Sequence, residues 1–319
     1  LALPAGDVVS LQRARSQAQA AASAAAAAAP VAAPQPKPPA DFFDDDFRVS
    51  LSRAAAAQPA APAPAAARPA APRAPALHPA AAPGLRYMGF EVAGPQELDA
   101  ALAELEAAGF PARRGDAAEC AARAVSGIGF TQDPGGHAIE LFYGPLVTNG
   151  YRNSRGMEFL TGALGMGHIN LFAADYARSA DFYTRTLGFR LTDSYHVGPD
   201  QTVNFFHTNP RHHTVGIMQI APFDGVHHLM LEVTELDMMG QAYDRVIAAG
   251  CRITASLGRH SNDRIVSFYV ESPSGVEVEI GWGAITVGPD WTPKYRGPGD
   301  IWGHHGLTAE SIEQTGGRA

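Results

Sequence analysis

From about residue 85 onward, the 319-residue chain carries three copies of one strand–helix–strand pattern, and this repeat constrains the fold more than any other feature. Two copies, Tyr87–Gly144 and His228–Gly283, match closely. Each begins with a short apolar strand ending in Glu-Val, continues into an amphipathic helix that ends at a glycine, and closes with a strand pair around a turn. A third copy begins at His168. One such module cannot bury its own apolar face, so we expect modules to pair.

The repeat predicts an α+β fold of βαβββ modules that pair into half-open barrels. The modules His168–Ile220 and Val226–Gly283 are expected to form one C-terminal catalytic domain, residues 151–286. The first module is expected to form a partial N-terminal, non-catalytic domain over residues 85–150, and residues 287–319 are a C-terminal extension. The module expected to pair with this first module would fall in residues 1–84, where the sequence is rich in alanine and proline.

Residues 1–84 are mostly alanine and proline. Alanine buries little apolar area and proline interrupts helices, so we expect this part to be disordered or extended. The string "DFFDDDFRVSL" is its only aromatic stretch, and it is either a solvated acidic segment, a strand remnant or a docking motif. Neither a signal peptide nor a membrane span is expected here.

The overall composition excludes some partners. The net charge of −8 gives no reason to expect nucleic acid or an anionic membrane as a partner. The only two cysteines, Cys120 and Cys251, are too few for a disulfide framework and form no C-x-x-C motif. We therefore expect a reduced, cytoplasmic protein.

Two histidines and a glutamate, His168, His228 and Glu279, occupy the corresponding points of the last two modules. Two imidazoles and one carboxylate that leave open coordination positions are the ligand set of non-haem Fe(II) oxygenases. Mn(II) suits the same ligands. The alternative is that these are buried core groups held by hydrogen bonds.

Superposing the modules sorts the candidate ligands. Tyr87 falls where His228 stands and Glu140 where Glu279 stands, so the first module is not expected to bind metal. The same superposition favours His228 over His227, and strand alternation puts these neighbours on opposite faces. It also favours Glu279 over Glu277. We do not expect His207, His304 or His305 to be ligands, and we expect Glu140 and Glu232 to cap or pair within the fold.

With these residues in place, the chain from about Leu85 resembles the type I extradiol ring-cleavage dioxygenases of the vicinal oxygen chelate superfamily. The resemblance rests on five strings in this order: "GMGHINLF", "NPRHHTVGI", "VHHLMLEV", "LGRHSNDRIVSFYVESPSGVEVEIGW" and "IWGHHG". It implies a two-domain protein whose second domain holds iron inside a half-open barrel. It also implies cleavage, by O₂, of a bicyclic or substituted catechol such as 2,3-dihydroxybiphenyl, in the degradation of aromatic compounds.

The resemblance gives each residue a role. His168, His228 and Glu279 match the iron ligands. His213 matches the acid/base histidine, although His212 is its rival, and His260 and Tyr269 match the groups that hydrogen-bond the catecholate. The substrate-binding positions are Asn170, Phe205, Asn262 and Asp263. A homo-oligomer is also expected.

Two features depart from the family pattern. The family has a further module ahead of the segment that corresponds to "LRYMGFEV", whereas this chain has an alanine- and proline-rich segment there. Either the start of the gene was read in the wrong frame or the module was genuinely replaced. Asn170 stands where the family commonly has an apolar residue, on the same strand face as His168. It either favours a more polar catechol or bonds neighbouring protein groups.

Two other functions fit parts of the pattern. A glyoxalase-like metal isomerase or transferase would not need His213, His260 and Tyr269. A non-catalytic small-molecule-binding protein of the same superfamily would be expected to lose its metal ligands, as the first module has.

Overall fold

The computed structural model describes residues 85–147, 153–198, 201–220, 222–296 and 299–307. The predictions made for residues 1–84, namely disorder and the loss of a first module, lie outside the described residues.

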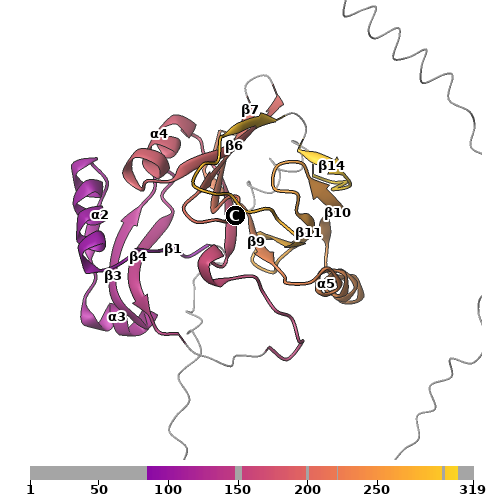
Figure 1. Ribbon diagram of the computed structural model, residues 1–319, viewed down its shortest axis with the longest axis horizontal. Helices are drawn as coiled ribbons and strands as arrows, with labels where there is room; N and C mark the ends of the chain where they lie inside the picture. Colours follow the sequence, from indigo (N-terminus) through magenta and orange to yellow (C-terminus); the bar gives the residue numbers. More distant parts are fainter. Residues whose placement is uncertain (1–84, 148–152, 199–200, 221, 297–298, 308–319) are drawn as a thin grey trace, which may run out of the picture. The chain divides into compact units, whose positions relative to one another are not determined.

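The first module forms a four-stranded sheet with the order β1-β4-β3-β2 (Figure 1). Its elements are β1 (Met88–Glu91), α2 (Pro95–Ala107), β2 (Ala112–Arg114), α3 (Ala117–Arg123), β3 (Val125–Gln132) and β4 (Ala138–Pro145). Helix α2 buries Leu98, Leu102 and Leu105, which recur at helical spacing on one face. The chain leaves it through Gly109, whose φ of 81° lies in the left-handed region that glycine adopts without strain.

The other two modules share one ten-stranded sheet, β13-β6-β7-β8-β5-β9-β12-β11-β10-β14. The second module consists of β5 (Gly167–Phe172), α4 (Tyr176–Asp181), the π-helical turn η2 (Phe182–Thr186), β6 (Arg190–Gly198), β7 (Gln201–His207) and β8 (Val215–Gln219). The third consists of β9 (Gly225–Glu232), α5 (Leu236–Ala248), β10 (Ile253–His260), β11 (Val266–Glu271) and β12 (Glu277–Trp282). In all three modules the first strand pairs with the fourth, the fourth with the third and the third with the second. This common order confirms the repeat read from the sequence.

The two modules join where β5 and β9 run antiparallel, and this seam positions the functional side chains. Asn170 pairs with His228, whereas the next residue, Leu171, pairs with Val226. The register shift leaves His227 as the extra residue of a β-bulge, a feature that bends a strand and re-aims its side chains. The alternation predicted for His227 and His228 is therefore wrong. Both side chains are buried, and their ring centroids lie 4.7 Å apart.

The C-terminal extension supplies both edges of the large sheet. Strand β13 (Lys294–Arg296) pairs with β6, and β14 (Asp300–Trp302) pairs with β10. A short 3-10 turn, η1 (Gly162–Leu164), precedes β5. Each of these strands has only three residues, and short edge strands present few open backbone groups to solvent.

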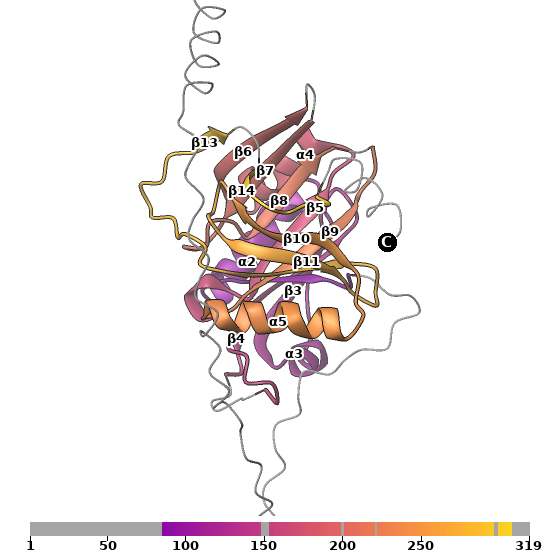
Figure 2. The ribbon, with the colours of Figure 1, turned by 90° about the vertical axis from the view of Figure 1, so that its right-hand side faces the viewer.

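Apolar side chains fill the space between helices and sheets. Phe182 and Tyr183 are fully buried where η2 meets the first module, and the Tyr183 hydroxyl donates to Asp133 Oδ2 at 2.8 Å. Helix α5 packs on β11 and β12, and its Met239 and Ala242 lie in one apolar cluster with Phe268. Figure 2 shows α5 running alongside β11.

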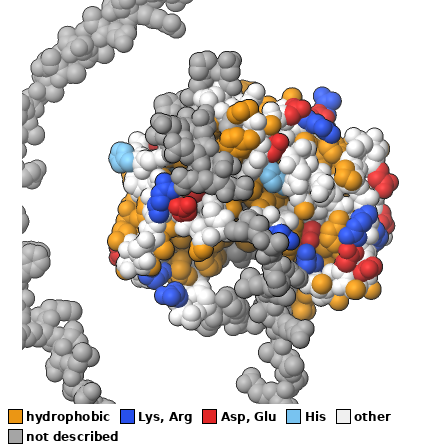
Figure 3. Space-filling model, turned by 180° about the vertical axis from the view of Figure 1, so that it is seen from behind, with side chains coloured by type: hydrophobic (Ala, Val, Ile, Leu, Met, Phe, Trp, Pro, Cys, Tyr) orange, Lys and Arg blue, Asp and Glu red, His pale blue; other side chains and the backbone are white. Residues whose placement is uncertain are grey.

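Charged side chains are dispersed on the described surface that Figure 3 draws, where acidic and basic groups are mixed among apolar ones. In the described part of the chain, no helix is both long enough and apolar enough to span a membrane.

Candidate metal centre

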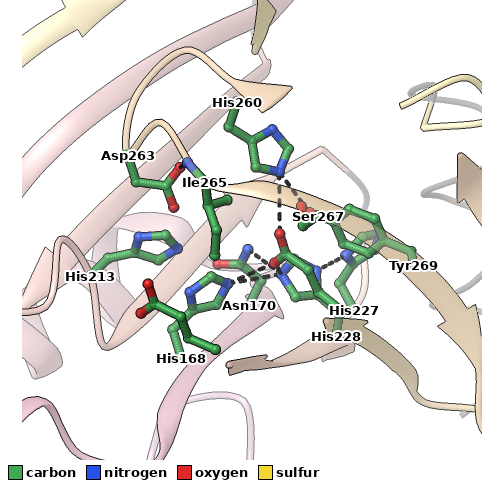
Figure 4. A network of polar contacts seen from close by, with 12 residues as sticks. His168, Asn170, His213, His227, His228, His260, Asp263, Ile265, Ser267 and Tyr269 are labelled. Atoms are coloured by element: carbon green, nitrogen blue, oxygen red, sulfur yellow. Dashed lines mark hydrogen bonds and ion pairs between the residues drawn. The ribbon is translucent and has the colours of Figure 1, made fainter. Parts of the chain in front are cut away.

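Three ligand atoms converge at the seam between β5, β9 and β12. His168 Nε2 lies 3.1 Å from His228 Nε2 and 3.2 Å from Glu279 Oε2, and the third side of this triangle, from His228 Nε2 to Glu279 Oε2, is 3.3 Å. All three side chains are buried. Figure 4 shows His168 and His228 directed at each other, with His260 reaching toward them from another strand. The structure thus brings the three predicted ligands together.

The protonation of these groups favours a bound cation. Burial lowers the pKa of His168 to about 4, so its imidazole is neutral near pH 7. Burial alone would raise the pKa of the Glu279 carboxyl, but the imidazoles of His168, His228 and His260 hold it well below its usual range. The site therefore presents a carboxylate and at least one neutral imidazole, which is the state in which these groups bind metals.

The geometry fits a metal ion. Ligand atoms about 2.1 Å from one ion lie about 3.0 Å apart in an octahedron and about 3.4 Å apart in a tetrahedron. The three observed separations of 3.1, 3.2 and 3.3 Å fall in this range. Neither oxygen of Glu279 has a hydrogen-bond partner of good geometry among the described residues. A buried carboxylate without donors is costly, and a cation between it and the imidazole lone pairs removes that cost.

His213 stands beside the triad at the end of a buried chain of polar groups. Its ring stacks on that of His168, with centroids 3.8 Å apart. His213 Nδ1 lies 3.1 Å from His212 Nδ1, and His212 Nε2 lies 3.2 Å from Asp193 Oδ2. His213 Nε2 has no hydrogen-bond partner among the described residues. Burial lowers the pKa of His213 well below its usual value, with further lowering from His168 and His212, so the ring is neutral.

The chain of contacts assigns the tautomer of His213. The nitrogen of His212 that faces the Asp193 carboxylate donates to it, so we assign the other nitrogen as the acceptor toward His213. His213 then donates from Nδ1, and its Nε2 is left with a lone pair. His212, the rival of His213 in the sequence, acts as the support of that ring.

His260 and Tyr269 approach Glu279 from the opposite side. His260 Nε2 lies 2.8 Å from the Tyr269 hydroxyl and 3.5 Å from Glu279 Oε1. Burial lowers the pKa of His260, but the hydrogen bond with Asp300 and the nearby negative charge of Glu279 outweigh it and raise the value to about 10. Burial and the negative charges of Glu279 and Asp263 raise the pKa of Tyr269 well above its usual value. The predicted catalytic residues thus gather around the triad.

The predicted substrate-binding residues are also buried near these groups. Asn170 Nδ2 lies 3.0 Å from His228 Nε2, and its Oδ1, which has no hydrogen-bond partner among the described residues, lies over Gly216. The Phe205 ring packs against His213, with centroids 4.6 Å apart. Asn262 and Asp263 are buried, and Asp263 Oδ1 accepts from the backbone N–H of Ile265 at 3.1 Å.

The first module contains an ion pair at the position of the metal site. Gly89 pairs with Glu140 as Met230 pairs with Glu279, so Tyr87 and Glu140 occupy the places of His228 and Glu279. Arg123 donates to both oxygens of Glu140, at 2.9 Å and 2.8 Å, and its guanidinium lies 4.5 Å above the Tyr87 ring. A guanidinium thus neutralises this carboxylate, which confirms that Glu140 pairs within the fold.

Glu232 also pairs within the fold, with Arg211. Arg211 Nη1 donates to Glu232 Oε2 at 2.5 Å, and its other nitrogens donate to the carbonyls of Leu160 and Leu164 at 2.9 Å. Sequence reasoning overlooked Arg211, although it opens the quoted string "RHH". A hollow of about 1650 Å³ nearby is lined by Leu164 and His168 but by none of the other predicted site residues. It lies outside the polar centre, so we do not assign it to the substrate.

Comparison with known proteins places this geometry in a family. The family model described as the Glyoxalase/Bleomycin resistance protein/Dioxygenase superfamily matches residues 165–280. A biphenyl-2,3-diol 1,2-dioxygenase from Metapseudomonas furukawaii is 39% identical over 242 residues, which cover 72% of this chain and 78% of that protein. The chain belongs to the extradiol dioxygenases. The resemblance read from its motifs is thereby confirmed.

Other relatives of this extradiol dioxygenase agree. An iron-dependent extradiol dioxygenase from Rhodococcus jostii (strain RHA1) is 33% identical over 232 residues, covering 69% of this chain and 77% of that protein. The crystal structure of BphC, a halotolerant catechol dioxygenase, superposes with a TM-score of 0.69 at 35% identity and covers 72% of this chain and 78% of that chain. The fold prediction is confirmed, and a metal cofactor is supported by both the relatives and the converging ligand atoms.

Proposed function

We propose that this extradiol dioxygenase cleaves the ring of a bicyclic or substituted catechol, such as 2,3-dihydroxybiphenyl, beside its two hydroxyl groups and inserts both atoms of O₂. The observation that supports this most directly is the convergence of His168, His228 and Glu279 within 3.3 Å, next to the unpartnered Nε2 of His213. A catecholic substrate and O₂ are the only partners that the proposal requires.

We propose Fe(II) as the resident metal, held by His168, His228 and Glu279. An imidazole, imidazole and carboxylate set with open positions suits Fe(II), and one relative is named iron-dependent. Mn(II) is compatible with the same ligands. When bound, the iron would supply adjacent positions for the two catechol oxygens and O₂ and would mediate electron transfer between them.

His213 is proposed as the acid/base group. Its Nε2 lone pair faces the site and can take a hydroxyl proton from the catechol as the substrate binds. The imidazolium formed can then stabilise negative charge that develops on oxygen and return the proton. The Nε2 atom is buried and the Phe205 ring packs against the imidazole, and such low-dielectric surroundings strengthen both interactions.

Tyr269 and His260 are proposed to orient the catecholate from the side of Glu279. The hydroxyl of Tyr269 and Nε2 of His260 form one hydrogen-bonded pair, 2.8 Å apart, so a substrate oxygen that bonds one is held by both. A proton on this pair is available for ring opening. Asn262 and Asp263 complete the proposed substrate-facing surface.

Asn170 is proposed to select the substituent on the catechol. Its nearest polar neighbour is His228 Nε2, but a metal bound there would occupy that lone pair and free the amide. A polar substituent or a water molecule could then bond the amide. Gly216 beside it leaves the room that this amide occupies.

Oligomerisation and a cytoplasmic location remain predictions. The second rests on the free state of Cys120 and Cys251.

A colour assay tests the proposed function. The full chain is reconstituted anaerobically with Fe(II), mixed with 2,3-dihydroxybiphenyl and exposed to air, and ring cleavage yields a yellow product. We expect colour with the wild-type chain and none with His228→Ala. Failure with a panel of monocyclic and bicyclic catechols, at one bound Fe(II) per chain, would exclude ring cleavage and leave the isomerase or binding alternatives.

A further inference from the structure

One carboxylate of the C-terminal extension reaches the site and has no role in the function proposed above. Asp300 Oδ1 lies 2.6 Å from His260 Nδ1 and 2.7 Å from His304 Nδ1. The two imidazoles lie next to each other, with ring centroids 4.2 Å apart. Both of their Nδ1 atoms therefore meet a single oxygen.

The backbone fixes this arrangement. In the pairing of β14 with β10, Asp300 lies directly opposite His260. On one side of the pair, the Ser261 N–H donates to the Gly299 carbonyl at 2.9 Å, and on the other, the Ser256 N–H donates to the His305 carbonyl at 3.0 Å. Strand β14 is thus tied to β10 at both ends, so the position of Asp300 is set by the sheet.

His304 also binds the Asp300 carboxylate and supports it from the protein interior. It is fully buried, and its Nε2 lies 3.1 Å from the Ser267 carbonyl oxygen, which can only accept a hydrogen bond. Gly258 makes room for the ring, because a Cβ there would lie 2.4 Å from it. Asp300 supplies the carboxylate, and the motif "IWGHHG" that follows it supplies the buried His304 that supports this carboxylate and the turn that joins the two residues.

The contact with Asp300 determines how His260 can act. A ring nitrogen 2.6 Å from a carboxylate oxygen carries a proton, so His260 donates from Nδ1. This fixes the ring plane, and it leaves Nε2 directed at Tyr269 and Glu279. Without the carboxylate, the ring could rotate away from these partners.

We propose that Asp300 is a positioning residue of the active site: it binds His260 Nδ1 and so holds His260 Nε2 against Tyr269 and the bound catecholate. This inference rests on the proposed function, because it takes His260 to be a substrate-orienting group. It makes the C-terminal strand β14 part of the catalytic machinery.

The test compares Asp300→Asn with Asp300→Glu and with Asp290→Asn, an exposed carboxylate of the same extension. In the Fe(II)-loaded full chain, we expect Asp300→Asn to lower kcat about 10- to 100-fold while iron content stays at one per chain. Asp300→Glu should recover part of this loss, and Asp290→Asn should match the wild type. Loss of iron from Asp300→Asn, or a kcat within threefold of the wild type, would overturn the proposal.

A second readout does not depend on turnover. In the Zn(II)-loaded full chain, a proton on His260 Nδ1 bonded to a carboxylate should give a far-downfield NMR resonance, assigned by its absence from His260→Gln. We expect this resonance to disappear in Asp300→Asn and persist in Asp290→Asn. Persistence in Asp300→Asn would refute the contact. If the wild-type chain cleaved no catechol, the proposed function would fail, while this experiment would still decide whether Asp300 positions His260.

Discussion

Arg211→Met should lower the free energy of unfolding by about 3–5 kcal/mol, because it leaves the buried carboxylate of Glu232 without its partner. The side chains of Arg211 and Glu232 are only 2% and 3% exposed, and their charged atoms are 2.5 Å apart. Arg211 also donates to the carbonyls of Leu160 and Leu164, just ahead of the strand that carries His168.

The cost has two parts. The carbonyls of Leu160 and Leu164 lose a charged hydrogen-bond donor, and this loss is included in the total of about 3–5 kcal/mol. Loss of the ion pair adds the desolvation of an isolated Glu232, which among the described residues retains only its bond from the Ala284 N–H at 2.9 Å. For a folded unit of this size, the total corresponds to a fall in Tm of roughly 6–20 °C.

Chemical denaturation with urea measures the effect, and two further variants test its cause. Arg252 forms an ion pair with Glu271 at 3.0 Å, but its side chain is 60% exposed, so Arg252→Met should cost less than about 1 kcal/mol. Adding Glu232→Gln to Arg211→Met should recover part of the loss, because the buried charge is gone. If Arg211→Met cost no more than Arg252→Met, or if the double variant were no more stable than Arg211→Met, the reasoning would be refuted.

Three further predictions concern the site and its surroundings. His228→Ala should keep the fold but lose stoichiometric Fe(II), measured by metal analysis and circular dichroism; full iron retention would contradict the ligand assignment. His213→Ala should retain iron and anaerobic catechol binding but lose about 10²–10⁴-fold in kcat, and an unchanged kcat would exclude the acid/base role. Burial raises the pKa of Tyr183 well above its ordinary value, so its stabilising effect is complete below about pH 10 and is lost as pH rises through the folded-state value. Tyr183→Phe should therefore flatten the decline in Tm above pH 10, and an equally steep decline would show that this phenol does not titrate on unfolding.

The sequence was sufficient to predict the repeated βαβββ modules, their pairing and the convergence of the ligands. The repeated strand–helix–strand pattern shows that each copy must bury a similar apolar face, which one module cannot do alone. Once two such modules pair, residues at corresponding points approach one another. His168, His228 and Glu279 were found in this way, without any knowledge of the distances between them.

What the sequence did not reveal depends on long-range packing. The bulge at His227 has no local signal, since it arises from the register between β5 and β9. Pairing of β14 with β10 places Asp300 against His260 across 40 residues of chain. Nothing in the local sequence distinguishes Arg211 from a solvent-exposed loop arginine, because its partners Leu160, Leu164 and Glu232 lie far from it in the chain. Such contacts follow from tertiary structure and not from periodicity.

Because Arg123 binds Glu140, the effects of substitutions at Tyr87 and at Arg123 depend on each other. Tyr87→His alone would restore an imidazole but not a vacant carboxylate, because Arg123 would still occupy both oxygens of Glu140. Removal of Arg123 alone would leave a buried negative charge with no cation beside it. Metal binding in this module would therefore require at least both changes together. The effect of each change depends on the other, and of the two ligand positions compared above only the carboxylate of Glu140 is present.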